Sequence, residues 1–293
     1  MMNIVALLFH ALVFPGLLFC CVAGLLLSGL DRKQVARMQR RVGPPLLQPF
    51  YDVLKLWDKQ PIAVNKAVSF YVGGFLLFVL LTGVFFFTGG DILLAVFTLT
   101  MASVCLIIAG YATASPYSQE GAQRELVQSM AYEPMLLIVA LGFYLSAGSF
   151  FIRDIMQMPY MNFLRMPGIF LGFCYILLIK FRKSPFDISM SPEVHQELIG
   201  GVKTELSGRT LAVMEIAHWY ENVFLLGMVF LFFMSSAAWS LAVGFAACVA
   251  VYFFSILIDN SCSRMKWESM LASTWIVTLL AGFLNVAYLI YFK

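Results

Sequence analysis

The chain has 293 residues, of which 61% are hydrophobic and only 12% are charged. Soluble globular domains have an apolar share of about 45–50%, so this composition excludes a water-soluble globule and predicts an integral membrane protein. The net charge of +3 gives no indication of nucleic-acid binding, and no nucleic-acid partner is expected.

Apolar runs long enough to cross a hydrocarbon core, about 20 residues each, recur along the whole chain. They predict an all-α fold, a polytopic membrane helix bundle that forms a single domain over residues 1–293. The eight predicted spans are 3–30, 67–88, 92–114, 126–150, 160–179, 210–235, 239–258 and 269–292.

Lysine and arginine are distributed unequally between the two sides of these spans. Sixteen of the 19 follow spans one, three, five and seven, and the other side holds only Arg153, Arg165 and Lys293. Because basic loops stay cytoplasmic, we expect a multi-pass protein of the cytoplasmic membrane with both termini outside. The two long cytoplasmic loops, 31–66 and 180–209, indicate a docking platform for a soluble partner.

An amphipathic helix is predicted in the first long loop, at about residues 49–59. Pro49 suits the first turn of a helix, where its missing N–H costs nothing. Apolar residues then recur at helical spacing, namely Phe50, Val53, Leu54 and Trp57. The residues alone favour a simple anchor at the membrane surface.

Glu133 interrupts the fourth predicted span, beside Tyr132 and before Pro134. A carboxyl group within a bilayer is costly and most often functional. Pro134 removes a backbone hydrogen bond, which would make room for water. Glu133 is therefore either part of a proton path or a lone glutamate that is protonated or paired with a basic neighbour.

The sixth span carries Glu215, His218 and Glu221 at intervals of three, spread over about 120° of the helix face. Acids and a histidine that meet through water can relay protons. The spacing E-x-x-H also suits a metal, but such a site needs ligands from facing helices, and neither His10 nor His195 is placed to help. Since the six cysteines show no C-x-x-C spacing, we expect no metal and no iron–sulfur cluster in this chain.

Four acids precede that span, Asp187, Glu193, Glu197 and Glu205. Taken alone they indicate a solvated acidic loop. Three motifs surround them: 184–187 (SPFD), 195–198 (HQEL) and 204–208 (TELSG). Together with G-P-x-x-L-Q-P-x-x-D-x-x-K in the first long loop and the Tyr-Glu pair of the fourth span, they resemble the NuoH-type membrane subunit. That family is shared by respiratory complex I and the energy-converting membrane-bound nickel-iron hydrogenases.

Three features resemble the EchB-like hydrogenase branch of this family. They are the motif at 195–198, the pair Glu133-Pro134, and Asp259-Asn260-Ser261 followed by Arg264-Met265. The resemblance implies the membrane anchor of a ferredoxin-dependent, hydrogen-evolving complex. It implies no catalytic residue and no cofactor in this chain; the nickel-iron centre and the iron–sulfur clusters would lie in partner subunits.

The partners implied are a hydrogenase large subunit and an iron–sulfur small subunit on the cytoplasmic face, an antiporter-like membrane subunit, ferredoxin indirectly, and the lipid bilayer. The implied proton or ion path consists of Tyr132, Glu133, Glu205, Glu215, His218 and Glu221. The implied redox-arm interface and cavity consist of Arg40, Arg41, Asp52, Lys55, Asp187, Glu193 and Glu197.

Two alternatives remain open. One is the quinone-site membrane subunit of an NADH:quinone oxidoreductase, and the other is a stand-alone secondary transporter. The predicted spans contain no lysine in mid-membrane, which argues against an autonomous pump.

Overall fold

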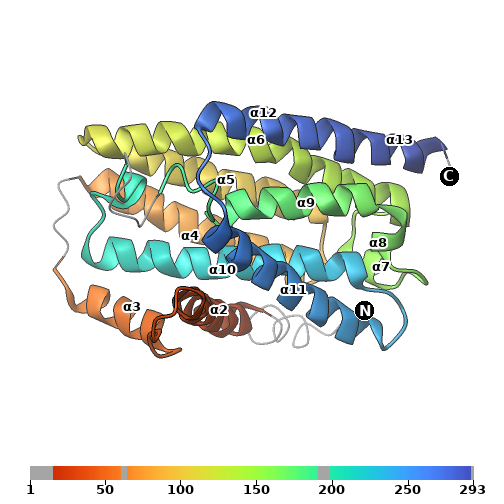
Figure 1. The fold of residues 1–293 in the computed structure, drawn as a ribbon, viewed down its shortest axis with the longest axis horizontal. Helices are drawn as coiled ribbons and strands as arrows, with labels where there is room; N and C mark the ends of the chain where they lie inside the picture. Colours follow the sequence, from red (N-terminus) through yellow and green to blue (C-terminus); the bar gives the residue numbers. More distant parts are fainter. Residues whose placement is uncertain (1–15, 61–64, 191–197, 292–293) are drawn as a thin grey trace.

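Helices make up nearly all of the computed structural model, which describes residues 16–60, 65–190 and 198–291. Within these ranges no strand is formed, and isolated bridge residues such as Asp91 and Phe151, which pair with each other, are the only β-structure. The predicted all-α membrane bundle is confirmed (Figure 1). Its elements are α2 (Leu17–Met38), α3 (Gln48–Asp58), α4 (Lys66–Phe87), α5 (Ile92–Tyr111), α6 (Pro116–Ala147), α7 (Ile152–Met156), α8 (Asn162–Arg165), α9 (Pro167–Lys180), η1 (Gly201–Lys203), α10 (Gly208–Phe233), α11 (Ser240–Ser261), α12 (Trp267–Val277), η2 (Thr278–Phe283) and α13 (Leu284–Tyr291).

In the described part of the chain, six helices are long and apolar enough to cross a membrane. They are α4, α5, α6, α10, α11 and the continuous helix formed by α12, η2 and α13. In contrast, α9 has only 14 residues, or about 21 Å at 1.5 Å per residue. A hydrocarbon core is about 30 Å thick, so α9 is too short to cross it. Its last residue, Lys180, is buried inside the bundle.

Two helices extend well beyond the predicted spans. The fourth span is predicted to begin at residue 126, whereas α6 begins at Pro116, because the polar residues of its first turns pack inside the bundle. The first span is predicted to end at residue 30, whereas α2 continues to Met38. Both extensions carry charged residues on helices instead of loops.

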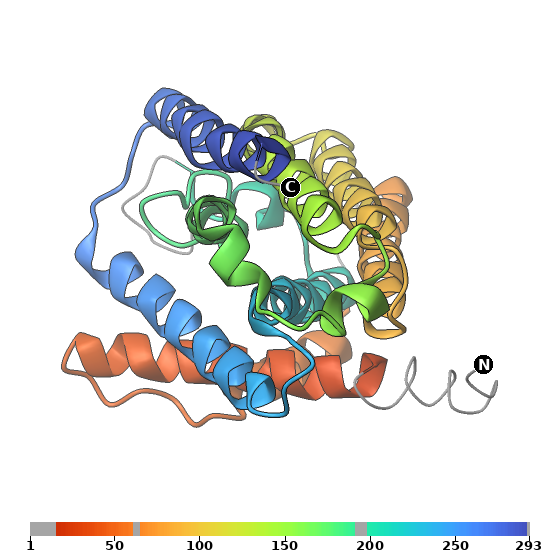
Figure 2. The ribbon, with the colours of Figure 1, turned by 90° about the vertical axis from the view of Figure 1, so that its right-hand side faces the viewer.

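The long helices lie side by side around α10, and α2 runs across them (Figures 1 and 2). Figure 1 shows α2 nearly end-on, and Figure 2 shows it along its length. It packs on α10 at Gly24, where an added Cβ would lie 2.5 Å from the carbonyl oxygen of Trp219. Only glycine permits this close approach.

The two halves of α10 have different surroundings. Its second half packs in an aromatic core, where the ring centroid of Phe232 lies 4.7 Å from that of Phe143 and 5.2 Å from that of Phe170. Glu215, His218 and Glu221 lie before that core, between the second turn of α10 and its middle. The polar groups are thus gathered at one end of the bundle.

Candidate functional site

A buried ion pair joins α9 to α10. The Nζ atom of Lys180 donates a hydrogen bond to Oε1 of Glu221 over 3.0 Å, and the two side chains are only 5% and 6% exposed. The same Nζ atom lies 4.2 Å from the ring centroid of Tyr132, on α6. A buried charge is tolerated when it is paired, and an aromatic face adds to the stabilisation of a cation.

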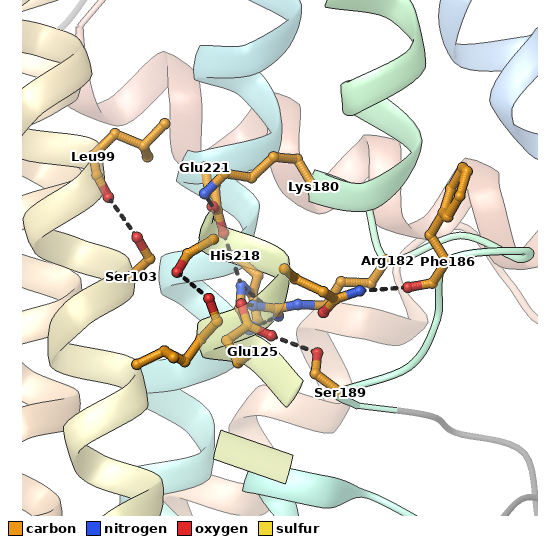
Figure 3. Close-up of polar contacts among 12 residues, drawn as sticks. Leu99, Ser103, Glu125, Lys180, Arg182, Phe186, Ser189, His218 and Glu221 are labelled. Carbon is orange, nitrogen blue, oxygen red and sulfur yellow. Dashed lines mark hydrogen bonds and ion pairs between the residues drawn. The ribbon is translucent and has the colours of Figure 1, made fainter. Parts of the chain in front are cut away.

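A second buried pair lies beside the first. Nη2 of Arg182 is 3.3 Å from Oε1 of Glu125, and Nη1 of Arg182 contacts the ring of His218 most closely at Nε2. His218 in turn places Nδ1 3.2 Å from Oε2 of Glu221. Figure 3 shows these side chains converging from α6, α9 and α10. We call Glu125, Lys180, Arg182, His218 and Glu221 the buried charge cluster.

The neighbours of His218 favour its neutral form. A carboxylate only accepts hydrogen bonds, so the Nδ1 atom that faces Glu221 carries a proton. Nη1 of Arg182 lies 2.5 Å from Nε2 and 3.2 Å from Nδ1, so the guanidinium sits over the imidazole ring and not on the lone pair of either nitrogen. A second positive charge against it is unfavourable. With His218 neutral, the buried charge cluster holds two cations and two carboxylates that balance each other.

Local helix geometry brings these groups together. His218 and Glu221 are three residues apart on α10, and Glu125 and Tyr132 are seven apart on α6, so each pair shares one helix face. Ser189, from the segment after α9, donates a hydrogen bond to Oε2 of Glu125. Both oxygens of that carboxylate are thereby bonded.

A cavity of about 1490 Å³ lies beside the buried charge cluster. Lys180, Arg182 and His218 form part of its wall. The elements that line it include α2, α10 and α11, which can be followed in Figure 2. Fourteen of the 34 described residues that line it are Asp, Glu, Lys or Arg. We call this space the charged cavity.

Ion pairs also connect the walls of the charged cavity. Lys183 bonds both carboxylate oxygens of Asp31, each at 2.7 Å, and Asp259 at 3.2 Å. Burial by itself would lower the pKa of Lys183, but the two aspartates outweigh it and raise that pKa above its usual range. Arg264 bonds Asp187 at 2.7 Å. These contacts join α2, α11 and the segment after α9.

The structure brings four of the six predicted ion-path residues close to the charged cavity. His218 and Glu221 belong to the buried charge cluster, and Tyr132 lies against Lys180. Glu215 lines the cavity and is paired with Lys203 at 2.7 Å.

The two other predicted ion-path residues lie apart. Glu133 is only partly buried on α6, outside the buried charge cluster, and Glu205 is exposed between η1 and α10. Their roles stay predictions.

The predicted interface residues are more dispersed. Asp187 is buried in the cavity wall, and Arg41 lines the cavity. Arg40 is exposed at the end of α2, and Lys55 is exposed on α3. Glu193 and Glu197 lie outside the described residues.

Asp52, on α3, faces Arg32 of α2. Its carboxylate accepts hydrogen bonds from Arg32 and from Gln48. Its slight burial opposes the charged form, but these hydrogen bonds outweigh that effect and hold the pKa of Asp52 below its usual range. The pair connects α3 to the helix that lines the charged cavity.

Lys180 and Arg182 are predicted to lie in the cytoplasmic loop, because charge ends an apolar run. In the structure both side chains are packed against buried carboxylates. The absence of a lysine from mid-membrane stays a prediction. Glu125 is also missing from the predicted path. The available signal is the uncharged run between Arg165 and Lys180, which has only 14 residues and is too short to cross a hydrocarbon core.

Within the described ranges, no group of three or more His, Cys, Asp or Glu side chains is placed to hold a metal ion. The expectation that this chain binds no cofactor stays a prediction.

Comparison with known proteins gives consistent matches along the chain. Residues 10–290 match a family model described as NADH dehydrogenase. An NADH-quinone oxidoreductase subunit from Thermomicrobium roseum is 26% identical, with 89% of this chain and 88% of that protein aligned. "Hydrogenase-4 component C" of Escherichia coli is also 26% identical, with 90% and 91% aligned.

A chain of a solved structure, the membrane-bound sulfane sulfur reductase, described as an archaeal respiratory membrane complex, superposes with a TM-score of 0.83. The alignment covers 95% of this chain and 99% of that chain. At 23% identity, this likeness shows the fold alone.

Proposed function

The chain belongs to the NADH dehydrogenase family over residues 10–290, and from that premise we propose that it couples redox chemistry to ion movement in a ferredoxin-dependent energy-converting nickel-iron hydrogenase complex. It is a multi-pass membrane subunit of the kind found in complex I-like and hydrogenase-like respiratory complexes. Its partners in the proposal are a hydrogenase large subunit and an iron–sulfur small subunit on the cytoplasmic face, and an antiporter-like subunit in the membrane. Ferredoxin would reach it only through those partners.

One observation carries the proposal: the charged cavity and the buried charge cluster are continuous. Arg182 and His218 belong to both, and Glu221 is one contact further in. Charges that touch in a low-dielectric interior influence one another strongly. An electron that arrives in a partner docked over the cavity therefore changes the energy of protons held by the cluster.

In this mechanism the chain breaks no covalent bond. Lys180 and Arg182 hold the carboxylates of the cluster charged, and His218 is the group that can gain a proton. Glu215 lies at the cavity end of the path. Glu133, partly exposed on α6, is assigned to the step toward the membrane neighbour.

The lining of the charged cavity favours the hydrogenase branch over a quinone-reducing subunit. Sites for apolar ligands are lined predominantly by hydrophobic and aromatic side chains. Here 14 of 34 described lining residues are charged, which suits water and a polar segment of a partner better than a prenyl tail.

The quinone-site subunit of an NADH:quinone oxidoreductase is the second candidate. It is favoured by the relatives that are named as NADH-quinone oxidoreductase subunits, such as those of Thermomicrobium roseum and Methylococcus capsulatus.

Purification in mild detergent through a tag on this chain tests the proposal. We expect a nickel-containing large subunit and an iron–sulfur subunit to co-purify, and reduced ferredoxin to drive hydrogen evolution by the isolated complex. A mock purification from the untagged strain gives the background. Recovery of an NADH-oxidising module with quinone reductase activity would replace this proposal with the second candidate.

A further inference from the structure

Arg182 has a backbone conformation that is uncommon for its residue type. Its φ is +54°, in the left-handed region. It terminates α9 with its own N–H bonded to the carbonyl of Ile179 at 3.0 Å and the N–H of Lys183 bonded to that of Leu178 at 3.0 Å. Glycine usually occupies this position of a helix stop. A residue held in such a conformation is strained, and such residues are often found at functional sites.

The side chain gives the reason for an arginine here. The left-handed turn directs the guanidinium to Glu125 on one side and to Nε2 of His218 on the other (Figure 3). Nη1 of Arg182 lies 2.5 Å from Nε2 and 3.2 Å from Nδ1, so the guanidinium covers the face of the imidazole ring. Nδ1 carries a proton toward Glu221, so Nε2 is the atom that an incoming proton would need, and Arg182 places a positive charge against it.

The groups around His218 oppose a second proton as long as Arg182 stays in place. The charged neighbours of the ring are Arg182, Lys203, Glu215 and Glu221. Lys180 and Glu125 complete the set as the partners of Glu221 and Arg182. Phe75 of α4 presents an apolar ring with its centroid 5.3 Å from that of His218. A protonated His218 would add an uncompensated charge to this buried set, directly against a guanidinium.

Arg182 also has space into which it can move. It lines the charged cavity, and so do the carboxylate-bearing residues Asp187 and Glu215. Withdrawal of the guanidinium into the cavity would free Nε2 of His218 and expose it to water at the same time. Because arginine stays protonated, the two positions differ only in where the charge sits.

We propose that Arg182 is a gate: in the observed position it caps His218 and blocks proton transfer, and its withdrawal into the charged cavity opens His218 to a proton. Arg182 acts through His218, so it is a positioning residue. The inference rests on the proposed ion-coupling function. It explains how ions are held back until the partner changes the charge at the cavity.

The test is the passive proton leak of the assembled complex in proteoliposomes, measured with a pH-sensitive dye without electron donor. Wild type holds an imposed pH gradient. Arg182→Gly removes the cap and relieves the backbone, so the helix stop is kept. We expect its leak to rise about tenfold or more, since loss of the cation against the ring lowers the cost of protonating His218.

Three further variants separate gating from damage. Arg182→Lys keeps a donor and a cation, so it should restore most of the seal. Arg182→Gly combined with His218→Gln should leak no more than wild type, because the proton acceptor is gone. Arg165 is exposed at the end of α8, away from the charged cavity. Arg165→Gln therefore removes an arginine without touching the gate, and no leak is expected.

The outcomes test the gate separately from the proposed ion-coupling function. A leak in Arg182→Gly that His218→Gln abolishes supports the gate. The gate is overturned if the proton leak of Arg182→Gly equals that of wild type, or if the leak persists in the double variant with His218→Gln. The proposed function stands in either case. If turnover of wild type builds no ion gradient, the proposed function fails and the gate fails with it.

Discussion

The ammonium of Lys180 lies 3.0 Å from the carboxylate of Glu221, and neither side chain is more than 6% exposed. The pair fastens the last turn of α9 to the middle of α10. The same carboxylate faces Nδ1 of His218 over 3.2 Å, so the pair is linked to the histidine of the buried charge cluster. In the proposed mechanism, stability and ion movement thus depend on the same two residues.

Removing one member of this pair should be far more harmful than removing both. Glu221→Gln or Lys180→Met alone leaves a buried charge without its partner, and we expect a loss of about 3–5 kcal/mol in stability. The double variant should recover most of that loss. Thermal unfolding of the purified protein in detergent gives the comparison. Equal losses in the double variant and the single variants would show that the pair does not act as a unit.

Replacement of the path carboxylates should affect coupling more than assembly. In Glu133→Gln and Glu215→Gln we expect electron transfer to continue while ion movement per electron falls. Glu120→Gln is the matched control on α6, since Glu120 is exposed and its pair with Arg124 is worth less than about 1 kcal/mol. Proteoliposomes with a pH-sensitive dye measure the ratio. Full coupling in both path variants would remove these glutamates from the path.

The grouping on α10 could be predicted because it is local. Glu215, His218 and Glu221 share a helix, and helical spacing determines which of its residues point the same way. The structure places all three at the polar end of the bundle. No contact with another helix was needed for that prediction.

The partners of these residues could not be predicted from spacing. Glu125 and Arg182 are 57 positions apart, and their contact depends on how α6 and α9 pack. Charge counting places Lys180 and Arg182 in a loop, because a local pattern does not show that a neighbouring carboxylate makes burial possible. The one hint of their burial is that the apolar helix before them, α9, is too short to cross a membrane.

The amphipathic helix likewise could be predicted from local spacing, but its packing could not. Its apolar stripe predicts a helix at 49–59, and α3 runs from Gln48 to Asp58. The stripe does not show which side faces protein. In the structure, Val53 is buried in the bundle, whereas Phe50 and Leu54 are 43% and 47% exposed.

The contribution of Lys183 to stability should disappear at alkaline pH. Its pKa is raised in the folded protein by Asp31 and Asp259, so its stabilising effect is complete below the unfolded pKa of about 10.4 and is lost as pH rises through the folded value. Lys183→Met lacks this effect at every pH. We expect the gap in unfolding midpoint between wild type and variant to be largest near neutral pH and to narrow above pH ~10.4. A gap that does not change with pH would assign Lys183 a packing role only.

The close contact of α2 with α10 should tolerate no side chain at position 24. In Gly24→Ala the new Cβ would meet Trp219 backbone and side-chain atoms at 2.5–2.7 Å, and backbone cannot yield as a flexible side chain can. We expect a loss of about 1–3 kcal/mol, as in other overpacked contacts. Gly73→Ala on α4 is the matched control, because nothing lies within 4 Å of its added Cβ. That change should stabilise the helix by about 0.5–1 kcal/mol. Thermal unfolding of both variants decides the matter, since equal midpoints would mean that α2 does not pack on α10 this closely.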